Sequence, residues 1–141
     1  MRAKIAAVVA ALACGGAEDR GEPAEPAREL VPAAYEVPFD LAIGERALVA
    51  GALHVAFERV AEETRCPEGV RCVQAGNAAA AFAVEGGAGS ATLTLNTGRE
   101  PRSAAAAGHE LRLVGLEPRP PADVAIDTGA YEATLIVTPA P

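Results

Sequence analysis

Short runs in which apolar and polar residues alternate recur along this chain, and they constrain its fold more than any other feature. Successive side chains of a β-strand point to opposite faces, so a period of two predicts a strand with one buried face. We expect strands at residues 35–43, 47–49, 53–57, 78–84, 91–95, 111–116 and 131–137. Seven short strands predict an all-β fold, either an antiparallel sandwich with immunoglobulin-like topology or a small barrel.

Turn residues and breaks in the alternation refine this prediction. Pro38 lacks a backbone donor, which places the first strand at a sheet edge. The alternation slips between Phe57 and Val60, as it does at a β-bulge. Glycines at 86–89 predict a hairpin, and residues 127–129 predict a turn. The alanines at 104–107 could form a single helical turn but are too few to nucleate an independent helix.

The amino terminus has the order of segments found in an export signal. A basic start with Arg2 and Lys4 precedes an apolar run at residues 5–12, which is too short to span a bilayer. Residues 1–13 are therefore predicted to be a signal peptide. The sequence Ala-Leu-Ala-Cys at 11–14 resembles the lipobox of bacterial lipoproteins, in which the cysteine is acylated, with palmitate as a typical chain. Ordinary cleavage after Ala13, leaving Cys14 as a free thiol, stays open as the alternative.

Residues 14–34 would then form a lipidated cysteine and a tether, because they are rich in Gly, Pro and Glu and poor in large apolar groups. The β domain is assigned to residues 35–139. A lipid-anchored protein of this kind lies in the cell envelope, at the outer membrane of a Gram-negative cell and otherwise on the outer face of the cytoplasmic membrane. The net charge of −7 argues against nucleic-acid binding, since no basic stripe is present to neutralise phosphates.

Two cysteines, Cys66 and Cys72, close a short polar stretch between two apolar runs. Pro67 and Gly69 lie between them and allow the chain to turn back within the distance that a disulfide requires. We expect a disulfide here, because the exported compartment is oxidising. A ring this small contributes only about 2 kcal/mol by the chain-entropy estimate, so the bond fixes one loop rather than the whole domain.

The residues around these cysteines resemble a motif of small, uncharacterised bacterial secreted proteins and lipoproteins. In that motif an acidic-Ser-Arg-Cys-Pro run is followed by Cys-x-Trp-x-Gly, and this chain reads Glu-Thr-Arg-Cys-Pro at 63–67 and Cys-Val-Gln-Ala-Gly at 72–76. Thr64 replaces the usual Ser, and Gln74 replaces the usual Trp. The resemblance implies a β domain with the Cys66–Cys72 disulfide, and it implies no activity.

Residues with catalytic or metal-binding chemistry are few and poorly arranged. Neither Ser90 nor Ser103 lies in a nucleophile-elbow motif, so a serine hydrolase is disfavoured. His54 and His109 are expected at the surface, and zinc binding by them with the two cysteines is less favoured than a disulfide. Carboxylates crowd the approach to the cysteines but lack the spacing of a calcium loop, which predicts a solvated rim balanced by arginines. These residues are Glu58, Glu62, Glu63, Glu68, Arg59, Arg65 and Arg71.

Three functions remain from different classes. The first is a lipid-anchored binding or interaction module, with no catalytic residues, no cofactor and no metal, and with an unknown envelope protein as partner. The second is a protease-inhibitor-like protein that presents Arg71 on the disulfide loop, and the third is a small hydrolase. We favour the first. The closed loop makes Glu68 and Arg71 the candidate contact residues, because a preorganised loop loses less entropy on binding. The alternative that the ring only pins the connection between two strands stays open.

Overall fold

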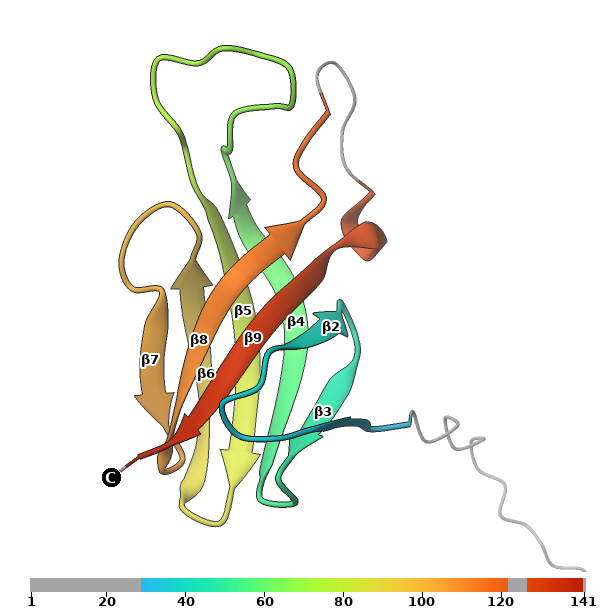
Figure 1. The fold of residues 1–141 in the computed structure, drawn as a ribbon, viewed down its shortest axis with the longest axis vertical. Helices are drawn as coiled ribbons and strands as arrows, with labels where there is room; N and C mark the ends of the chain where they lie inside the picture. Colours follow the sequence, from blue (N-terminus) through green and yellow to red (C-terminus); the bar gives the residue numbers. More distant parts are fainter. Residues whose placement is uncertain (1–28, 122–126, 141) are drawn as a thin grey trace, which may run out of the picture.

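A computed structural model describes residues 29–121 and 127–140 of the chain. Nine strands in these residues form two sheets packed face to face, and the only helical element among them is one 3-10 turn (Figure 1). The predicted all-β sandwich is confirmed, with nine strands rather than about seven. The two sheets remain separate, so the alternative of a small closed barrel is wrong.

Each sheet is built mainly from strands that follow one another in the sequence. The five-stranded sheet has the order β1 (Val31–Ala33), β3 (Arg46–Val49), β4 (Leu53–Glu63), β5 (Ala78–Gly86) and β6 (Gly89–Asn96). The four-stranded sheet has the order β2 (Phe39–Ala42), β9 (Glu132–Pro139), β8 (His109–Glu117) and β7 (Ser103–Ala106). All pairs are antiparallel except β1 with β3. This order lacks the interleaved ABED and CFG arrangement of immunoglobulin domains, which was the expected topology.

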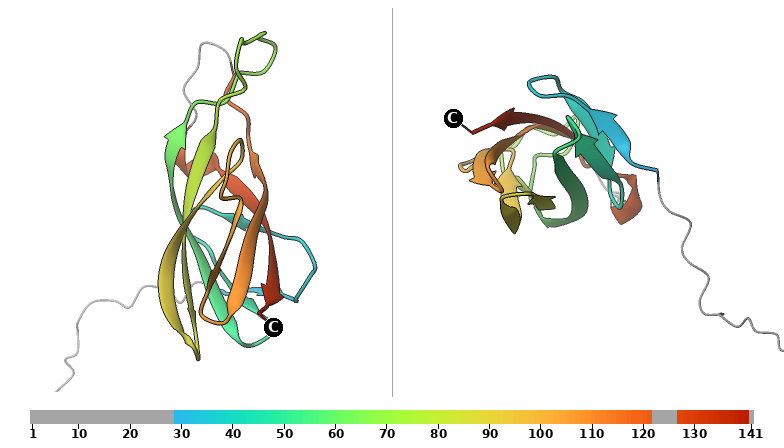
Figure 2. Two further views of the ribbon diagram at one scale, coloured as in Figure 1. Left: turned by 90° about the vertical axis from the view of Figure 1, so that its left-hand side faces the viewer. Right: turned by 90° about the horizontal axis from the view of Figure 1, so that it is seen from below.

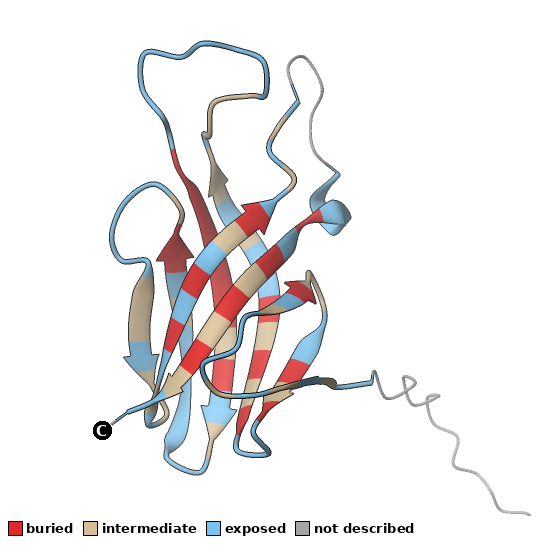
Figure 3. Ribbon diagram, viewed as in Figure 1, coloured by how far each residue is buried: buried red, intermediate tan, exposed pale blue. Residues whose placement is uncertain are grey.

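The core lies between the sheets and follows the alternation read from the sequence (Figure 3). In β9, for example, Ala133, Leu135 and Val137 are buried while their neighbours are half-buried or exposed. The rings of Phe57 and Phe82 pack against each other across β4 and β5, with centroids 5.0 Å apart. Burial of these side chains supplies the main stabilisation of the sandwich, at roughly 1.5–3 kcal/mol for each large residue.

The predicted irregularities of the longest strand are present. The β4–β5 register shifts between Phe57 and Arg59, where a bulge was expected, and again between Val60 and Glu62. The predicted hairpin joins β5 to β6, with Gly86 opposite Gly89. A 3-10 turn, η1 (Thr128–Ala130), occupies the predicted turn, and the Asp127 side chain accepts a hydrogen bond from the Gly129 N–H at 3.0 Å.

The start of the domain differs from the prediction. The expected strand at residues 35–43 is interrupted, because residues 35–37 form a turn in which Glu36 has a φ of 64°. Only β2 remains of it, at the predicted edge position beside β9. Ahead of the turn, β1 lies within the segment that had been assigned to the tether. The signal peptide, Cys14 and the tether up to residue 28 lie outside the described residues.

The prediction of a helical turn at residues 104–107 is wrong. Residues 103–106 form β7, which pairs with the start of β8. The connection is a two-residue turn in which Ala107 and Gly108 both have positive φ, at 53° and 75°. Such turns match the twist of paired strands, so the hairpin overrides the helix propensity of alanine. No helix in the described part of the chain is long and apolar enough to cross a membrane.

Candidate contact surface

The disulfide loop, residues 64–77, joins β4 to β5 and projects from one end of the sandwich (Figures 1 and 2). The predicted bond between Cys66 and Cys72 is present, with Cα atoms 5.9 Å apart. The first described residues enter in the other half of the molecule (Figure 1). There β1 lies level with the start of β4, since Val31 pairs with Ala47 and Ala47 with Val55. Eight residues of β4 separate that level from the loop, which is roughly 25 Å of strand.

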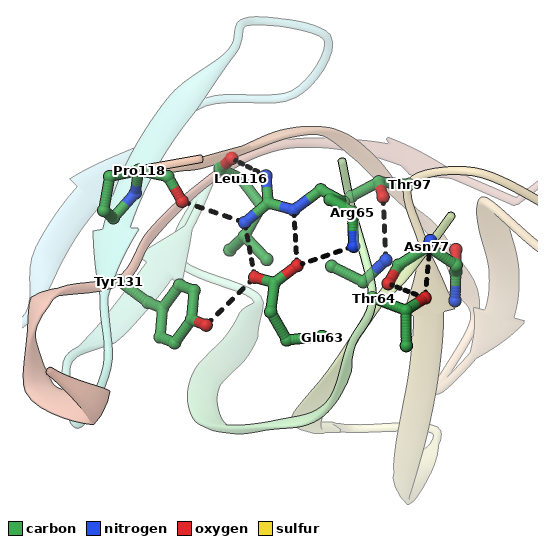
Figure 4. Close-up of polar contacts among 9 residues, drawn as sticks. Glu63, Thr64, Arg65, Asn77, Thr97, Leu116, Pro118 and Tyr131 are labelled. Carbon is green, nitrogen blue, oxygen red and sulfur yellow. Dashed lines mark hydrogen bonds and ion pairs between the residues drawn. The ribbon is translucent and has the colours of Figure 1, made fainter. Parts of the chain in front are cut away.

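The base of the loop is held by a two-pronged ion pair between Glu63 and Arg65 (Figure 4). The Arg65 Nε and one terminal nitrogen donate to the two Glu63 carboxylate oxygens at 2.8 and 2.7 Å. The guanidinium also donates to the carbonyl oxygens of Leu116 at 2.6 Å and Pro118 at 2.9 Å. Tyr131 completes the cluster by donating its hydroxyl proton to Glu63 at 2.9 Å. One arginine thus ties the loop to β8 and to the segment that follows it.

The ionisation of this cluster follows from its contacts and its burial. The side chains of Arg65 and Glu63 are only 10% and 20% exposed. Burial alone would raise the pKa of Glu63, but hydrogen bonds from Arg65 and Tyr131 outweigh it and lower that pKa. The hydrogen bond to Glu63 raises the pKa of Arg65. Burial and the hydrogen bond to Glu63 raise the pKa of Tyr131 to about 12. The cluster is therefore a charged pair bonded to a neutral phenol.

A second set of contacts closes the loop where its two strands meet. The backbone N–H and the hydroxyl of Thr64 donate to the Asn77 carbonyl at 2.7 and 3.0 Å, and the Asn77 N–H donates to the Thr64 hydroxyl oxygen at 2.9 Å. The buried Asn77 amide donates to Asn96 Oδ1 and accepts from the Gly98 N–H. Gly76 has a φ of 75°, and a Cβ there would overlap the Thr64 carbonyl oxygen. Only glycine fits this approach.

The tip of the loop, residues 68–74, is exposed throughout and is held by few contacts. The Glu68 N–H donates to the Pro120 carbonyl at 3.0 Å, which attaches the tip to the segment after β8. The side chain of Val73 is fully exposed, and that of Val70 is exposed as well. Glu68 and Arg71, the predicted contact residues, form no ion pair with any other described residue. The tip therefore combines free charges with apolar side chains on an anchored backbone.

The predicted solvated rim of carboxylates is only partly correct. Glu63 faces inward to Arg65 and Tyr131, and Glu62 pairs with Arg99 at 2.8 Å. Glu62 and Glu63 thus find different partners on different elements. Sequence reasoning missed Tyr131 and Arg99 as partners because they lie 68 and 37 residues away in the chain.

The two histidines are less exposed than predicted. His54 lies on β4 half-buried, and its Nδ1 has no hydrogen-bond partner among the described residues. His109 is also half-buried, with its Nδ1 2.8 Å from the Ala107 carbonyl and its Nε2 2.9 Å from the Tyr35 hydroxyl. Because a carbonyl only accepts, His109 Nδ1 donates to the Ala107 carbonyl. This contact links the β1–β2 turn to the start of β8.

Comparison with known proteins found no matching family model, no similar curated protein and no similar solved structure. No group of three or more His, Cys, Asp or Glu side chains in residues 29–121 and 127–140 is arranged to hold a metal ion.

Proposed function

We propose that this protein is a cell-envelope lipoprotein, anchored through acylated Cys14, whose β-sandwich is a module for binding another envelope protein. The tip of the disulfide loop is its contact surface. The observation that carries this proposal is the contrast between the two ends of the loop. The base is held by hydrogen bonds and an ion pair, whereas Val70, Arg71 and Val73 at the tip are exposed. Ordering the loop before binding lowers the entropy lost on association, which favours a binding role.

The position of the tip suits an anchored module. The chain enters the domain in the half away from the disulfide loop (Figure 1). The tip lies at the end of the sandwich away from that entry point, and this position supports a role in contacting a partner.

Photo-crosslinking in cells tests the contact surface directly. A photoreactive residue at Val73 is expected to give a discrete crosslinked protein, whereas the same residue at Val37, which is exposed on the β1–β2 connection, gives none. The Cys66→Ser/Cys72→Ser variant should lose most of the Val73 product, because the open loop is no longer preorganised. Equal labelling from Val73 and Val37 would contradict the proposed surface.

The anchor is tested by mass spectrometry of the mature protein. An acylated Cys14 as the first residue is the expected result. A mature protein that begins at an unmodified Cys14 would overturn the lipoprotein assignment while leaving the crosslinking result to stand by itself.

A further inference from the structure

A hollow of about 420 Å³ lies beside the base of the disulfide loop, on the end of the sandwich that carries the tip. Residues 75–76 of the loop and residues 97–98 after β6 form part of its wall. The rest is formed by Arg65, which is already paired with Glu63, by Gly115, Leu116 and Glu117 of β8, and by Arg119. The hollow is open to solvent, and three of its nine lining residues are glycines, which add no side chain to the wall.

Gly115 is the glycine that the fold itself does not require. Gly76 and Gly98 are needed, because a Cβ at either would overlap a backbone carbonyl oxygen. At Gly115 a Cβ would meet no atom within 4 Å, and its φ is not in the left-handed region. The β8–β9 register also shifts between Leu113 and Gly115. Bulges and unforced glycines in strands recur where another chain or a ligand approaches the backbone closely.

Charge distinguishes this end from the remaining surface. The loop-end surface, defined as residues 62–77, 97–102 and 115–121, carries five arginines and five glutamates. The other described residues carry three arginines against nine acidic residues, a net charge of −6. An acidic partner is therefore repelled by most of the domain and can approach this end. A strongly charged polyanion gains little here, since carboxylates are as numerous as guanidinium groups.

We propose that the hollow binds an extended, carboxylate-bearing segment of the partner protein, with the carboxylate paired to Arg119. Arg119 lines the hollow and forms no ion pair with any other described residue, and an arginine fork binds a carboxylate through two parallel hydrogen bonds. An extended segment fits because its backbone can lie against the glycine wall. This inference rests on the proposed function and names the chemistry of the partner.

Peptide selection on the purified mature protein tests the proposal. A displayed library of random dodecapeptides is selected on the wild type and on Gly115→Val, whose added side chain enters the open space at the wall. Peptides that prefer the wild type are expected to share an Asp or Glu. Changing that residue to Asn or Gln in a synthetic peptide should weaken binding about tenfold, as should Arg119→Ala.

Two matched variants control for nonspecific effects. Gly87→Val fills an exposed glycine position in the β5–β6 turn, where a Cβ also meets nothing within 4 Å, and should select the same peptides as the wild type. Arg112→Ala removes an exposed arginine of β8 that forms no ion pair with another described residue, and it should leave affinity unchanged. If Gly115→Val fails to fold, Arg119→Ala alone decides the result.

The proposal is overturned if no peptide discriminates wild type from these hollow variants, or if the discriminating peptides lack a carboxylate. That result together with a Val73 crosslink in cells would rule out binding in the hollow and leave the proposed function supported. Acidic, Gly115-dependent peptides without a Val73 crosslink would support binding in the hollow and rule out the loop tip as the contact surface.

Discussion

The base and the tip of the disulfide loop belong to one short segment, yet their polar groups are used in opposite ways. At the base, Glu63, Arg65 and Asn77 each form several internal hydrogen bonds, and Gly76 permits a close backbone approach. At the tip, the side chains of Glu68, Arg71 and Val73 contact little of the protein. The difference separates residues that hold the loop in place from residues that are free to contact a partner.

Most residues of the motif that the sequence resembles lie at the base of the loop. The acidic position, the arginine and the final glycine of the resemblance correspond to Glu63, Arg65 and Gly76, and all three hold the base. Gln74, which stands where the motif has Trp, is exposed at the tip. The resemblance itself stays a prediction, and in this chain Glu63, Arg65 and Gly76 hold the loop in place through their internal contacts.

Removing Arg65 should have the largest effect. Arg65→Ala leaves the Glu63 carboxylate, whose side chain is only 20% exposed, without its cation, and it removes the donor to the carbonyls of Leu116 and Pro118. We expect a loss of about 4 kcal/mol in the free energy of unfolding, measured by urea denaturation. Arg112→Ala, at an exposed position on β8, is the matched control and should change stability by about 0.5 kcal/mol or less. Equal effects from the two variants would contradict the structural role of the base.

The hydroxyl of Tyr131 should have an intermediate, pH-dependent effect. Tyr131→Phe removes a hydrogen bond to a carboxylate and should cost about 2 kcal/mol at pH 7. The pKa of Tyr131 is raised to about 12 in the folded protein from an ordinary value near 10. Its contribution is therefore fully present below pH 10 and is lost as the pH rises from 10 to 12, where the unfolded state ionises first.

Urea denaturation of the wild type and of Tyr131→Phe from pH 7 to 12 measures the difference in their free energies of unfolding. Tyr35 is present in both proteins, so its ionisation cancels in that difference. The stability advantage of the wild type should shrink above pH 10, and an advantage that stays constant up to pH 12 would rule out the raised pKa.

The fold was predictable where local pattern and tertiary structure agree. The alternation of apolar residues in β4, β5, β6 and β9, the bulge after Phe57 and the hairpin at 86–89 are all encoded within a few residues. The misplaced elements are those in which pairing overrides local preference. Residues 103–106 become a strand because β8 is available to pair, and β1 forms beside β3 in a stretch whose Pro and Glu content suggested a tether.

The loop was predictable in its covalent chemistry but not in its internal contacts. Two cysteines around Pro67 and Gly69 were sufficient to indicate the disulfide. The distant partners of Glu63 and Arg65 were not, since Tyr131 and the Leu116 carbonyl come from elements more than 50 residues away. A sequence shows that a glutamate and an arginine are two residues apart, but only the packed sheets decide whether they face each other or the solvent.

Variants of the tip should have the smallest effect on stability and the largest on binding. Arg71→Ala and Val73→Ser remove side chains that form no described ion pair or buried contact, so each should change the free energy of unfolding by about 0.5 kcal/mol or less. Each should nevertheless reduce binding to the protein captured by the Val73 crosslink, measured with purified components. Arginine is enriched among the residues that dominate binding energy, and Val73→Ser removes apolar area that the contact would bury. Thr94→Ala, on an exposed position of β6 away from the loop, controls for a general surface effect. A loss of 1 kcal/mol or more in stability would show that the tip packs on the domain, and unchanged binding would assign the contact surface elsewhere. The separation between base and tip therefore rests on one pattern of results: Arg65→Ala unfolds the loop, and Arg71→Ala leaves it folded without a partner.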